Sequence, residues 1–403
     1  MAQKLKIAIV GVGSRGLDCF GRILVERKDV EIAALCDPNP IRAKTAGEIL
    51  KIPAPVYTSM EEMAKSEQHL DGVIITSPDC YHHDCAVKAL NFGWNVLIDK
   101  PLATNAADGM DIIETAKKTG KTVMIGFNLR HNAVLKKLKE IIDSGVLGKV
   151  FLAENREFYD GGRTYMSRWN RLFSKTGGLW IHKASHDFDI FNWLLGFPKP
   201  LRVSSFAAVN ALTREGIPFP LEDGHEPGPN CNVCHYREKC RDRYLLSDDE
   251  LKRWGAEAAA VDGYVKNLCM YLSDKDNHDN GIAMVEYENG IKVSLFETFI
   301  GHKSDRIYTI AGDRGIAEVS LAGREIKITP RWGGAEITYK IQEEAGGHGG
   351  ADPNLVDSFC KVLRGEIKAG STAEHGLLAT ALGQAAEISR RQHRMVEMSE
   401  ILK

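Results

Sequence analysis

The sequence lacks any apolar run long enough to cross a membrane, and its charges nearly cancel. It carries 52 lysines and arginines against 54 aspartates and glutamates, for a formal net charge of -2 at pH 7. The amino terminus also lacks the order of basic, apolar and small-residue regions that marks a signal peptide. These absences argue against membranes and nucleic acids as partners, and they predict a cytoplasmic globular protein.

Cysteines are also few, since nine in 403 residues do not suggest a disulfide scaffold. Three of them nevertheless cluster in a polar stretch, at Cys231, Cys234 and Cys240. Two cysteines separated by two residues are a common half of a tetrahedral zinc site. The pattern indicates either a structural zinc, with Cys269 or a histidine as fourth ligand, or a loop with free or redox-active thiols.

A glycine-rich turn follows the first apolar run, Leu5 to Val10, and precedes a helical segment. Its first glycine allows the tight turn, its second lets the backbone approach a pyrophosphate, and its third lets the helix pack close to the strand. The free N–H groups at the start of that helix would face the anion. The predicted cofactor-binding residues of this turn are Gly11, Gly13, Ser14, Arg15 and Gly16.

An acidic residue ends the second apolar run, where Asp37 follows Val30 to Cys36. It lies about 20 residues beyond the last glycine, as the dinucleotide fingerprint requires. A carboxylate there can accept hydrogen bonds from both ribose hydroxyls and would repel a 2'-phosphate. The sequence therefore predicts NAD, with NADP less favoured, although Arg42 could tolerate a phosphate if the loop bends back.

The pattern of apolar runs changes near residue 126. Up to that point short runs alternate with amphipathic segments, which predicts a doubly wound parallel sheet with helices on both faces. Beyond it, strands of alternating character between residues 150 and 311 precede two closing helices. The predicted fold class is therefore α/β, with a Rossmann domain over 1–126 and an α+β domain over 127–403. The second domain is expected to hold a large mixed, mostly antiparallel sheet and a cysteine-bearing insertion at about 222–249.

A glycine pair, Gly177-Gly178, precedes a segment whose helical spacing would place His182, His186 and Asp189 on one face. A histidine and a lysine in one cleft suit hydride transfer from a secondary alcohol, because one group removes the hydroxyl proton while the other orients the oxygen. The alternative is a pair of structural helix histidines. A metal between His182 and His186 would lack a clear third ligand.

These features together resemble the glucose-fructose oxidoreductase, inositol dehydrogenase and MocA family (Gfo/Idh/MocA) over essentially the whole chain. The glycine turn and Asp37 fit the family's NAD domain, and an Asp-Lys-Pro motif stands where the family has Glu-Lys-Pro. The further segments that carry the resemblance are Thr76-Ser77-Pro78-Asp79-Cys80-Tyr81-His82, Asp99-Lys100-Pro101-Leu102, Gly126-Phe127-Asn128-Leu129-Arg130 and Gly177 to Asp189.

The resemblance implies roles for individual residues. Lys100 would lie beside the nicotinamide and the reacting hydroxyl, before a proline bond that is often cis, and His186 would complete the catalytic pair. His182 replaces the usual Asp, so substrate contact is expected of it, and a similar cysteine-bearing insertion in relatives favours Cys269 as a zinc ligand. The further expected cofactor-binding residues are Arg42, Thr76, Ser77, Pro78, His82, Asp99, Lys100 and Pro101.

The expected substrate is a sugar, glycoside or cyclitol. Aromatic faces at Tyr159 and Trp169 suit a pyranose ring, Arg130 could bind an acidic substituent, and His348 in a glycine-rich loop could reach a hydroxyl. Ordinary packing, solvated charge or a simple turn are the alternatives for these residues. The predicted substrate-binding residues are Arg130, Tyr159, Trp169, His182, Lys183 and His348.

The predicted function is NAD-dependent oxidation of a ring hydroxyl, in which Lys100 hydrogen-bonds the oxygen and His186 takes the proton. One alternative is an NAD-dependent glycosidase that oxidises its substrate transiently, eliminates the aglycone and returns the hydride. Another is a sensor that binds NAD and a sugar without turnover. The resemblance also implies a homodimer or homotetramer joined through the open face of the second sheet.

Overall fold

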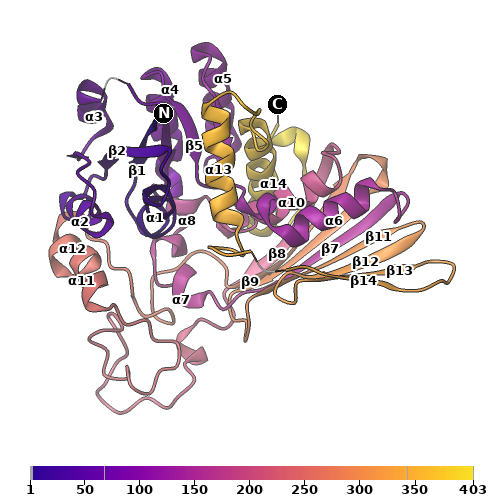
Figure 1. Ribbon diagram of the computed structural model, residues 1–403. Helices are drawn as coiled ribbons and strands as arrows, with labels where there is room; N and C mark the ends of the chain where they lie inside the picture. The colour runs from indigo at the N-terminus through magenta and orange to yellow at the C-terminus, as the bar shows by residue number, and fades with distance from the viewer. Residues whose placement is uncertain (1–2, 68, 343, 403) are drawn as a thin grey trace.

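The computed structural model describes residues 3–67, 69–342 and 344–402, which form two sheets flanked by helices (Figure 1). The first sheet has six parallel strands in the order β3-β2-β1-β4-β5-β6. The strand order reverses between β1 and β4, and parallel sheets bind ligands at the carboxyl edge of such a point. The strands are β1 (Leu5–Val10), β2 (Val30–Cys36), β3 (Val56–Tyr57), β4 (Gly72–Ile75), β5 (Asn95–Ile98) and β6 (Val123–Ile125).

Helices connect these strands, which confirms the predicted Rossmann arrangement. Side-chain caps set where three of them begin, because Asn39 accepts N–H groups at the start of α2, Ser59 at the start of α3 and Asn105 at the start of α5. The helices are η1 (Ser14–Gly21), α1 (Arg22–Val25), α2 (Pro40–Leu50), α3 (Met60–Ser66), η2 (Asp79–Tyr81), α4 (His82–Asn91) and α5 (Ala106–Thr119).

The second sheet has nine strands in the order β14-β13-β12-β11-β7-β10-β9-β8-β15. Only the β7–β10 pair among its described pairs is parallel, so the sheet is mixed and mostly antiparallel, as predicted. The strands are β7 (Val150–Phe158), β8 (Pro200–Ala208), β9 (Asn280–Tyr287), β10 (Lys292–Thr298), β11 (Asp305–Gly312), β12 (Gly315–Ser320), β13 (Glu325–Pro330), β14 (Ile337–Lys340) and β15 (Val396–Glu397).

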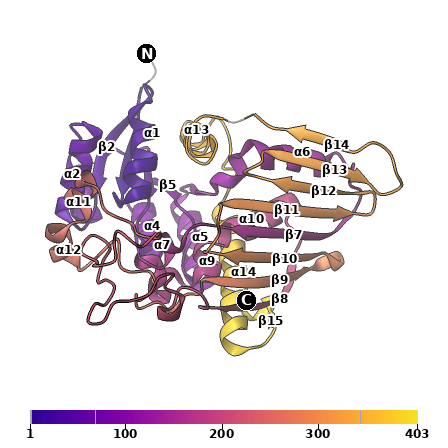
Figure 2. The same ribbon diagram turned by 90° about the horizontal axis from the view of Figure 1, so that it is seen from below.

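One face of this sheet is covered and the other is open. Helices α6 (Ala133–Asp143), α10 (Ser185–Leu194) and α14 (Ala373–Gln392) lie along the covered face (Figure 1, Figure 2). The open face exposes apolar side chains, among them Phe206, Ile282 and Met284. Within the described ranges, no helix combines the length and apolar character needed to cross a bilayer.

The histidine segment is not the single helix that its spacing predicts. It forms two helices, α9 (Leu179–His182) and α10, separated by Lys183 and Ala184. The break arises where the N–H of Ala184 reaches back five residues to the carbonyl of Leu179. His182 and His186 therefore belong to different helices rather than to one regular face.

Helix α13 (Ala351–Leu363) returns from the second half of the chain to the first sheet. Its Leu355 and Phe359 are fully buried in one core cluster with Ile7 and Ile9 of β1. Gly72 allows this approach, because a Cβ there would lie 2.9 Å from the ring of Phe359. The expected domain boundary after residue 126 follows β6 directly, but the core of the first domain also includes this later helix.

A long connection between β8 and β9 carries the predicted insertion. It contains α11 (Asp248–Trp254) and α12 (Ala256–Asp262), and both lie beside α2 of the first domain (Figure 1, Figure 2). Ser247 and Glu250 form a capping box that begins α11. The remaining short helices are η3 (Asn128–His131), α7 (Gly162–Tyr165), η4 (Trp169–Arg171), α8 (Phe173–Thr176), η5 (Arg214–Gly216), η6 (Glu288–Gly290) and η7 (Met398–Glu400).

Candidate active site

A cavity of about 1510 Å³ joins the two domains at the carboxyl edge of the first sheet. The glycine turn and Asp37 line one end, whereas Lys100 and His186 lie on its wall with side chains of the second domain. Pockets for one drug-sized ligand usually measure about 300–1,000 Å³, so this cavity has room for a dinucleotide together with a second molecule.

The predicted cofactor residues gather at this cavity with two exceptions. Gly16 and Pro101 are absent from its lining, because Gly16 packs against the turn and Pro101 contacts His82. The predicted cofactor residues that line the cavity are Gly11, Gly13, Ser14, Arg15, Asp37, Arg42, Thr76, Ser77, Pro78, His82, Asp99 and Lys100.

The glycine turn fits a dinucleotide. Gly11 has a φ of +87°, and a Cβ there would lie 2.6 Å from the backbone nitrogen of Ser77. A Cβ on Gly16 would lie 2.0 Å from the carbonyl oxygen of Gly11, whereas one on Gly13 would meet nothing closer than 3.8 Å. The backbone at Gly13 is therefore open to the cavity, where the helix amino terminus offers its N–H groups to a phosphate.

Asp37 is positioned for a ribose. Its two carboxylate oxygens accept the N–H groups of Val12 at 3.0 Å and Asn39 at 2.9 Å. Burial raises the pKa of Asp37, although these two hydrogen bonds act in the opposite direction. The carboxylate is thus fixed between the turn and the start of α2, where it can accept hydrogen bonds from ribose hydroxyls.

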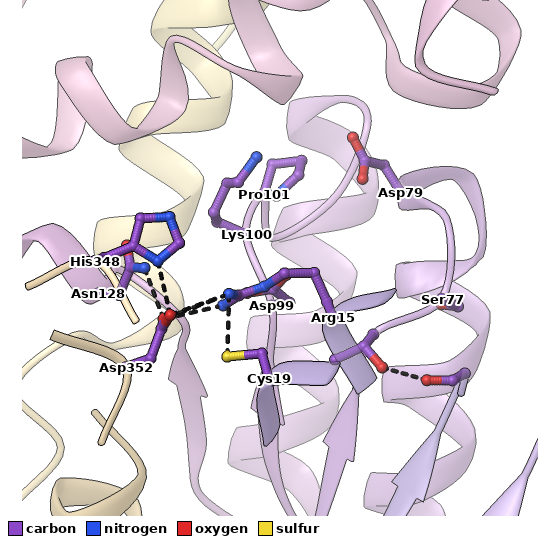
Figure 3. Close-up of polar contacts among 12 residues, drawn as sticks. Arg15, Cys19, Ser77, Asp79, Asp99, Lys100, Pro101, Asn128, His348 and Asp352 are labelled. Carbon is purple, nitrogen blue, oxygen red and sulfur yellow. Dashed lines mark hydrogen bonds and ion pairs between the residues drawn. The ribbon is translucent and has the colours of Figure 1, made fainter. Parts of the chain in front are cut away.

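Arg15 is bound by carboxylates instead of pointing freely into the cavity. Its guanidinium lies 3.0 Å from Asp99 and 3.4 Å from Asp352, with His348 and Asn128 on the other side of Asp352 (Figure 3). His348 Nδ1 lies 2.7 Å from Asp352. Burial acts to raise the pKa of Asp352, but His348 and Arg15 outweigh it and lower that pKa. The network joins the glycine turn to the loop before α13.

Lys100 projects into the cavity just beyond β5. Its ammonium donates to the backbone carbonyl of His182 at 2.6 Å, and the Lys100–Pro101 bond is cis, as the resemblance implied. Burial lowers the pKa of Lys100 to about 8, although the charges of Asp79 and Asp99 act to raise it. Burial also raises the pKa of Asp79 to about 7. A lysine that loses its proton near neutral pH can exchange one with a substrate hydroxyl.

His182 is anchored through both ring nitrogens. Nε2 accepts from the amide nitrogen of Asn170 at 2.9 Å, so Nδ1 carries the proton that it donates to Asp79 at 2.6 Å. The rings of Tyr165 and Trp169 contact its imidazole edge to face. Burial lowers the pKa of His182 well below its ordinary value. It lines the cavity as a fixed neutral ring.

His186 lies on the same cavity wall and is less constrained. Its Nδ1 is buried, and no described residue forms a hydrogen bond with it. Burial lowers the pKa of His186 well below its ordinary value, and the charge of Lys100 acts in the same direction. His186 therefore presents a neutral imidazole that can take part in a new hydrogen bond.

Lys183 forms a buried ion pair behind these groups. Its ammonium lies 2.9 Å from Glu157 and 4.1 Å from the ring centre of Tyr159. Burial acts to lower the pKa of Lys183, but the charge of Glu157 outweighs it and raises that pKa. Lys183 is therefore a permanent cation on the cavity wall, next to the aromatic face of Tyr159.

Arg130 lies outside the cavity lining, unlike the other predicted substrate residues. Its guanidinium forms a two-pronged, buried pair with Asp189, at 2.8 and 2.6 Å. The structure therefore joins Arg130 to α10 instead of placing it near a substrate. The predicted substrate residues that do line the cavity are Tyr159, Trp169, His182, Lys183 and His348.

The four cysteines predicted to hold zinc line one small cavity: Cys231, Cys234, Cys240 and Cys269. Among the described residues, however, no three of these sulfurs lie within 4.8 Å of one another. The one described group of three potential ligand atoms that meets this distance is exposed and consists of Glu222, His225 and His235. The thiols are near one another but not at the spacing of a zinc tetrahedron, so the zinc site stays a prediction.

The connection between β8 and β9, beyond the predicted insertion at about 222–249, supplies cavity residues that the sequence pattern did not single out. Trp254, Asp262, Tyr264 and Lys266 line the cavity near the glycine turn and α2. The one local signal for them is the Ser-Asp-Asp-Glu capping box before α11, which predicts a helix in a stretch otherwise taken for a loop. Their place over the cofactor end of the cavity depends on contacts between distant parts of the chain.

Two segments of the chain match the two domains of one protein family. Residues 5–127 match GFO_IDH_MocA, described as "Oxidoreductase family, NAD-binding Rossmann fold". Residues 139–398 match GFO_IDH_MocA_C, described as "Oxidoreductase family, C-terminal alpha/beta domain". The two matches follow the two sheets of the structure.

Curated proteins and solved structures agree with these matches. The YteT protein of Bacillus subtilis (strain 168) is 28% identical over 98% of each chain. The inositol 2-dehydrogenase of Salmonella typhimurium (strain LT2) is 34% identical over 47% of this chain and 54% of that protein, about half of each.

Two solved structures share the whole fold. The WlbA dehydrogenase from Bordetella pertussis, in complex with NADH and UDP-GlcNAcA, has 19% identity and a TM-score of 0.70, covering 98% of this chain and 99% of that one. An aldose-aldose oxidoreductase from Caulobacter crescentus has 17% identity and a TM-score of 0.71, covering 98% of this chain and 100% of that one. At these identities the likeness concerns the fold.

Proposed function

Because the chain belongs to the Gfo/Idh/MocA oxidoreductase family, we propose that it oxidises a ring hydroxyl of a sugar, glycoside or cyclitol, with NAD as the hydride acceptor. The observation that carries this proposal is the single cavity in which the dinucleotide turn meets Lys100, His182 and His186. NAD would be held by the glycine turn and Asp37, and it supplies an acceptor for the hydride.

The electrostatics of the site favour Lys100 as the group that takes the hydroxyl proton. Its pKa of about 8 lies close to physiological pH, so a fraction of Lys100 is the neutral amine there, and general bases work best in this range. The sequence suggested His186 for this step, but its lowered pKa makes His186 a weaker base. In the proposed mechanism His186 instead accepts or donates a hydrogen bond as a neutral imidazole and orients the hydroxyl.

Further side chains that line the cavity suit a polyhydroxylated substrate. Tyr159 and Trp169 offer aromatic faces, whereas Lys183 and the half-exposed His348 offer polar groups. Inositol 2-dehydrogenase and aldose-aldose oxidoreductase, to which this chain is similar, are named for substrates of this kind. The proposal leaves Arg130 out of substrate binding because of its pair with Asp189.

The test is to incubate the purified protein and NAD with a panel of sugars, inositols and glycosides. NADH absorbance and released sugar are recorded in the same samples. Accumulating NADH matched by a keto-sugar is the expected result, and Lys100→Met provides the inactive control. Silence across the panel, despite measured binding of NAD and of a sugar, would contradict the proposal and favour a sensor.

Released sugar without net NADH would instead show a glycosidase that oxidises its substrate transiently. That reaction needs an additional acid-base group near the cavity. Tyr159, His182, Lys183 and His348 are the described candidates on its wall. His182, Lys183 and His348 each pair with a buried carboxylate, and His348 has the most exposed side chain of the three, at 54%.

A further inference from the structure

Residues 248–266 reach from the second domain to the cofactor end of the cavity, and we call them the clasp. They comprise α11, α12 and the segment up to Lys266, and they contact α2 of the first domain. Arg253 of the clasp lies 3.1 Å from Asp18. Asn39, the cap of α2, donates to the carbonyl of Ala258 at 2.9 Å. The clasp is thus attached both to the helix that follows the glycine turn and to the start of α2.

The centre of this attachment is Arg42. Two of its nitrogens lie 2.6 and 2.9 Å from the carboxylate oxygens of Asp262, and its side chain is 9% exposed. The guanidinium also lies over the rings of Trp254 at 4.7 Å and Tyr264 at 5.6 Å. Planar two-pronged pairs of this kind are among the stronger polar contacts in proteins.

Asp262 is held in place by more than the ion pair. It accepts from the side-chain amide of Asn39 at 3.2 Å and from the backbone N–H of Tyr264 at 3.1 Å. It lines the cavity together with Asp37 and Arg42. The ring of Trp254 comes within 3.8 Å of the place where a Cβ on Gly13 would stand. The clasp therefore covers the ribose and pyrophosphate end of the dinucleotide site.

We propose that the clasp selects NAD against NADP through Asp262, which pairs with Arg42, a cation of the cavity wall that a 2'-phosphate could otherwise use. This inference rests on the proposed binding of a dinucleotide. A phosphate on the ribose would approach two carboxylates, Asp37 and Asp262, while Arg42 stays engaged by Asp262. Asp37, the acidic residue after β2, thus acts together with a second carboxylate, Asp262. Asp262 lies 220 positions beyond Arg42 in the sequence.

The test compares Kd values for NAD and NADP, measured by calorimetry on the wild type and on Asp262→Asn. The amide keeps one acceptor oxygen, for either the Asn39 side chain or the Tyr264 N–H, and removes the charge. In Asp262→Asn the ratio of the two Kd values should shift towards NADP by about tenfold or more, since one charged contact is worth about 1.4 kcal/mol or more. The wild type should bind NAD more tightly.

Two further variants separate the ion pair from other effects. Adding Arg42→Ala to Asp262→Asn should abolish the gain for NADP, because the gain requires the released guanidinium. Asp249→Asn, an exposed change on α11 next to Lys252, is the matched control and should leave the ratio unchanged.

Three outcomes would contradict the role of the clasp, and they differ in what they mean for the proposed function. An unchanged ratio in Asp262→Asn, with NAD binding retained, would overturn the role of the clasp and leave the proposed function intact. A gain that survives Arg42→Ala would also overturn it. A wild type that binds neither dinucleotide would overturn the proposed function and this inference with it.

Discussion

At the scale of single residues, the site depends on how burial changes the ionisation of a few side chains. Lys100 and Asp79 are both removed from water, and each is displaced towards its neutral form. The charge of Asp79 acts to raise the pKa of Lys100, against the effect of burial, so the protonation states of the two groups depend on each other near neutral pH. Catalytic pKa values close to the working pH are typical of proton-transfer sites.

We expect kcat/KM for alcohol oxidation to rise with pH and to level off above about 8. The reason is that Lys100, with its pKa of about 8, accepts a proton only in the neutral form. The reverse reaction, carbonyl reduction, should fall over the same range because it needs the ammonium. Steady-state rates from pH 6 to 10 in both directions provide the measurement.

Two variants identify the titrating group. Asp79→Asn removes a negative charge that raises the pKa of Lys100, so the rise in the profile should move to lower pH. Lys100→Arg keeps the charge but cannot lose its proton, and it should reduce kcat by about 100-fold or more. A profile that Asp79→Asn does not move would point to another group as the base.

At the scale of elements, buried polar pairs fix how the helices lie around the site. Arg130 of η3 binds Asp189 of α10, and the two side chains are 6% and 1% exposed. Burial raises the pKa of Asp189 to about 6, while the charge of Arg130 acts to lower it. The pair ties the segment after β6 to the helix that carries His186.

Removing one member of this pair should be costly. We expect Arg130→Met to lower the free energy of unfolding by about 3–5 kcal/mol, because it leaves an unpaired carboxylate in the interior. Arg394→Met, which breaks an exposed pair with Glu400, should lower the free energy of unfolding far less. Urea denaturation compares the two. Normal stability with a raised substrate KM would instead support the substrate role that the sequence suggested for Arg130.

Elements with a strong local pattern could be predicted from the sequence, and those fixed by distant contacts could not. Strand β7 begins at residue 150, where the predicted alternating strands begin, and α5 lies among the amphipathic segments predicted before residue 126, because alternation and helical periodicity are visible locally. The break between α9 and α10 was missed, since the periodicity continues across it. The clasp was missed because Arg42 and Asp262 show their pairing only in the folded chain.

At the scale of the whole molecule, the nine-stranded sheet leaves one apolar face open. Phe206 is 69% exposed, and it lies opposite Ile282, which is 46% exposed, in the β8–β9 register. Met284 continues this row along β9 and is 48% exposed. A contiguous apolar surface of this kind favours burial in an assembly, and we propose that a second copy of the chain covers it.

Accordingly, the wild type should be a dimer or tetramer by light scattering. Phe206→Glu combined with Ile282→Glu should weaken the assembly by about 100-fold or more, because it places charges in an apolar interface. Val233→Glu, at a side chain 64% exposed in the insertion, is the control and should leave the mass unchanged. A monomeric wild type would contradict the proposal.

Helix α13 has a consequence for the order in which the chain is synthesised. The ribosome completes residues 1–126 well before it reaches residue 351, so the apolar surface that Leu355 and Phe359 later cover stays exposed during most of translation. A chain whose translation stops early would keep that surface exposed and offer it to chaperones and proteases. A chain that includes α13 can bury this apolar surface, whereas a chain truncated before α13 leaves it accessible.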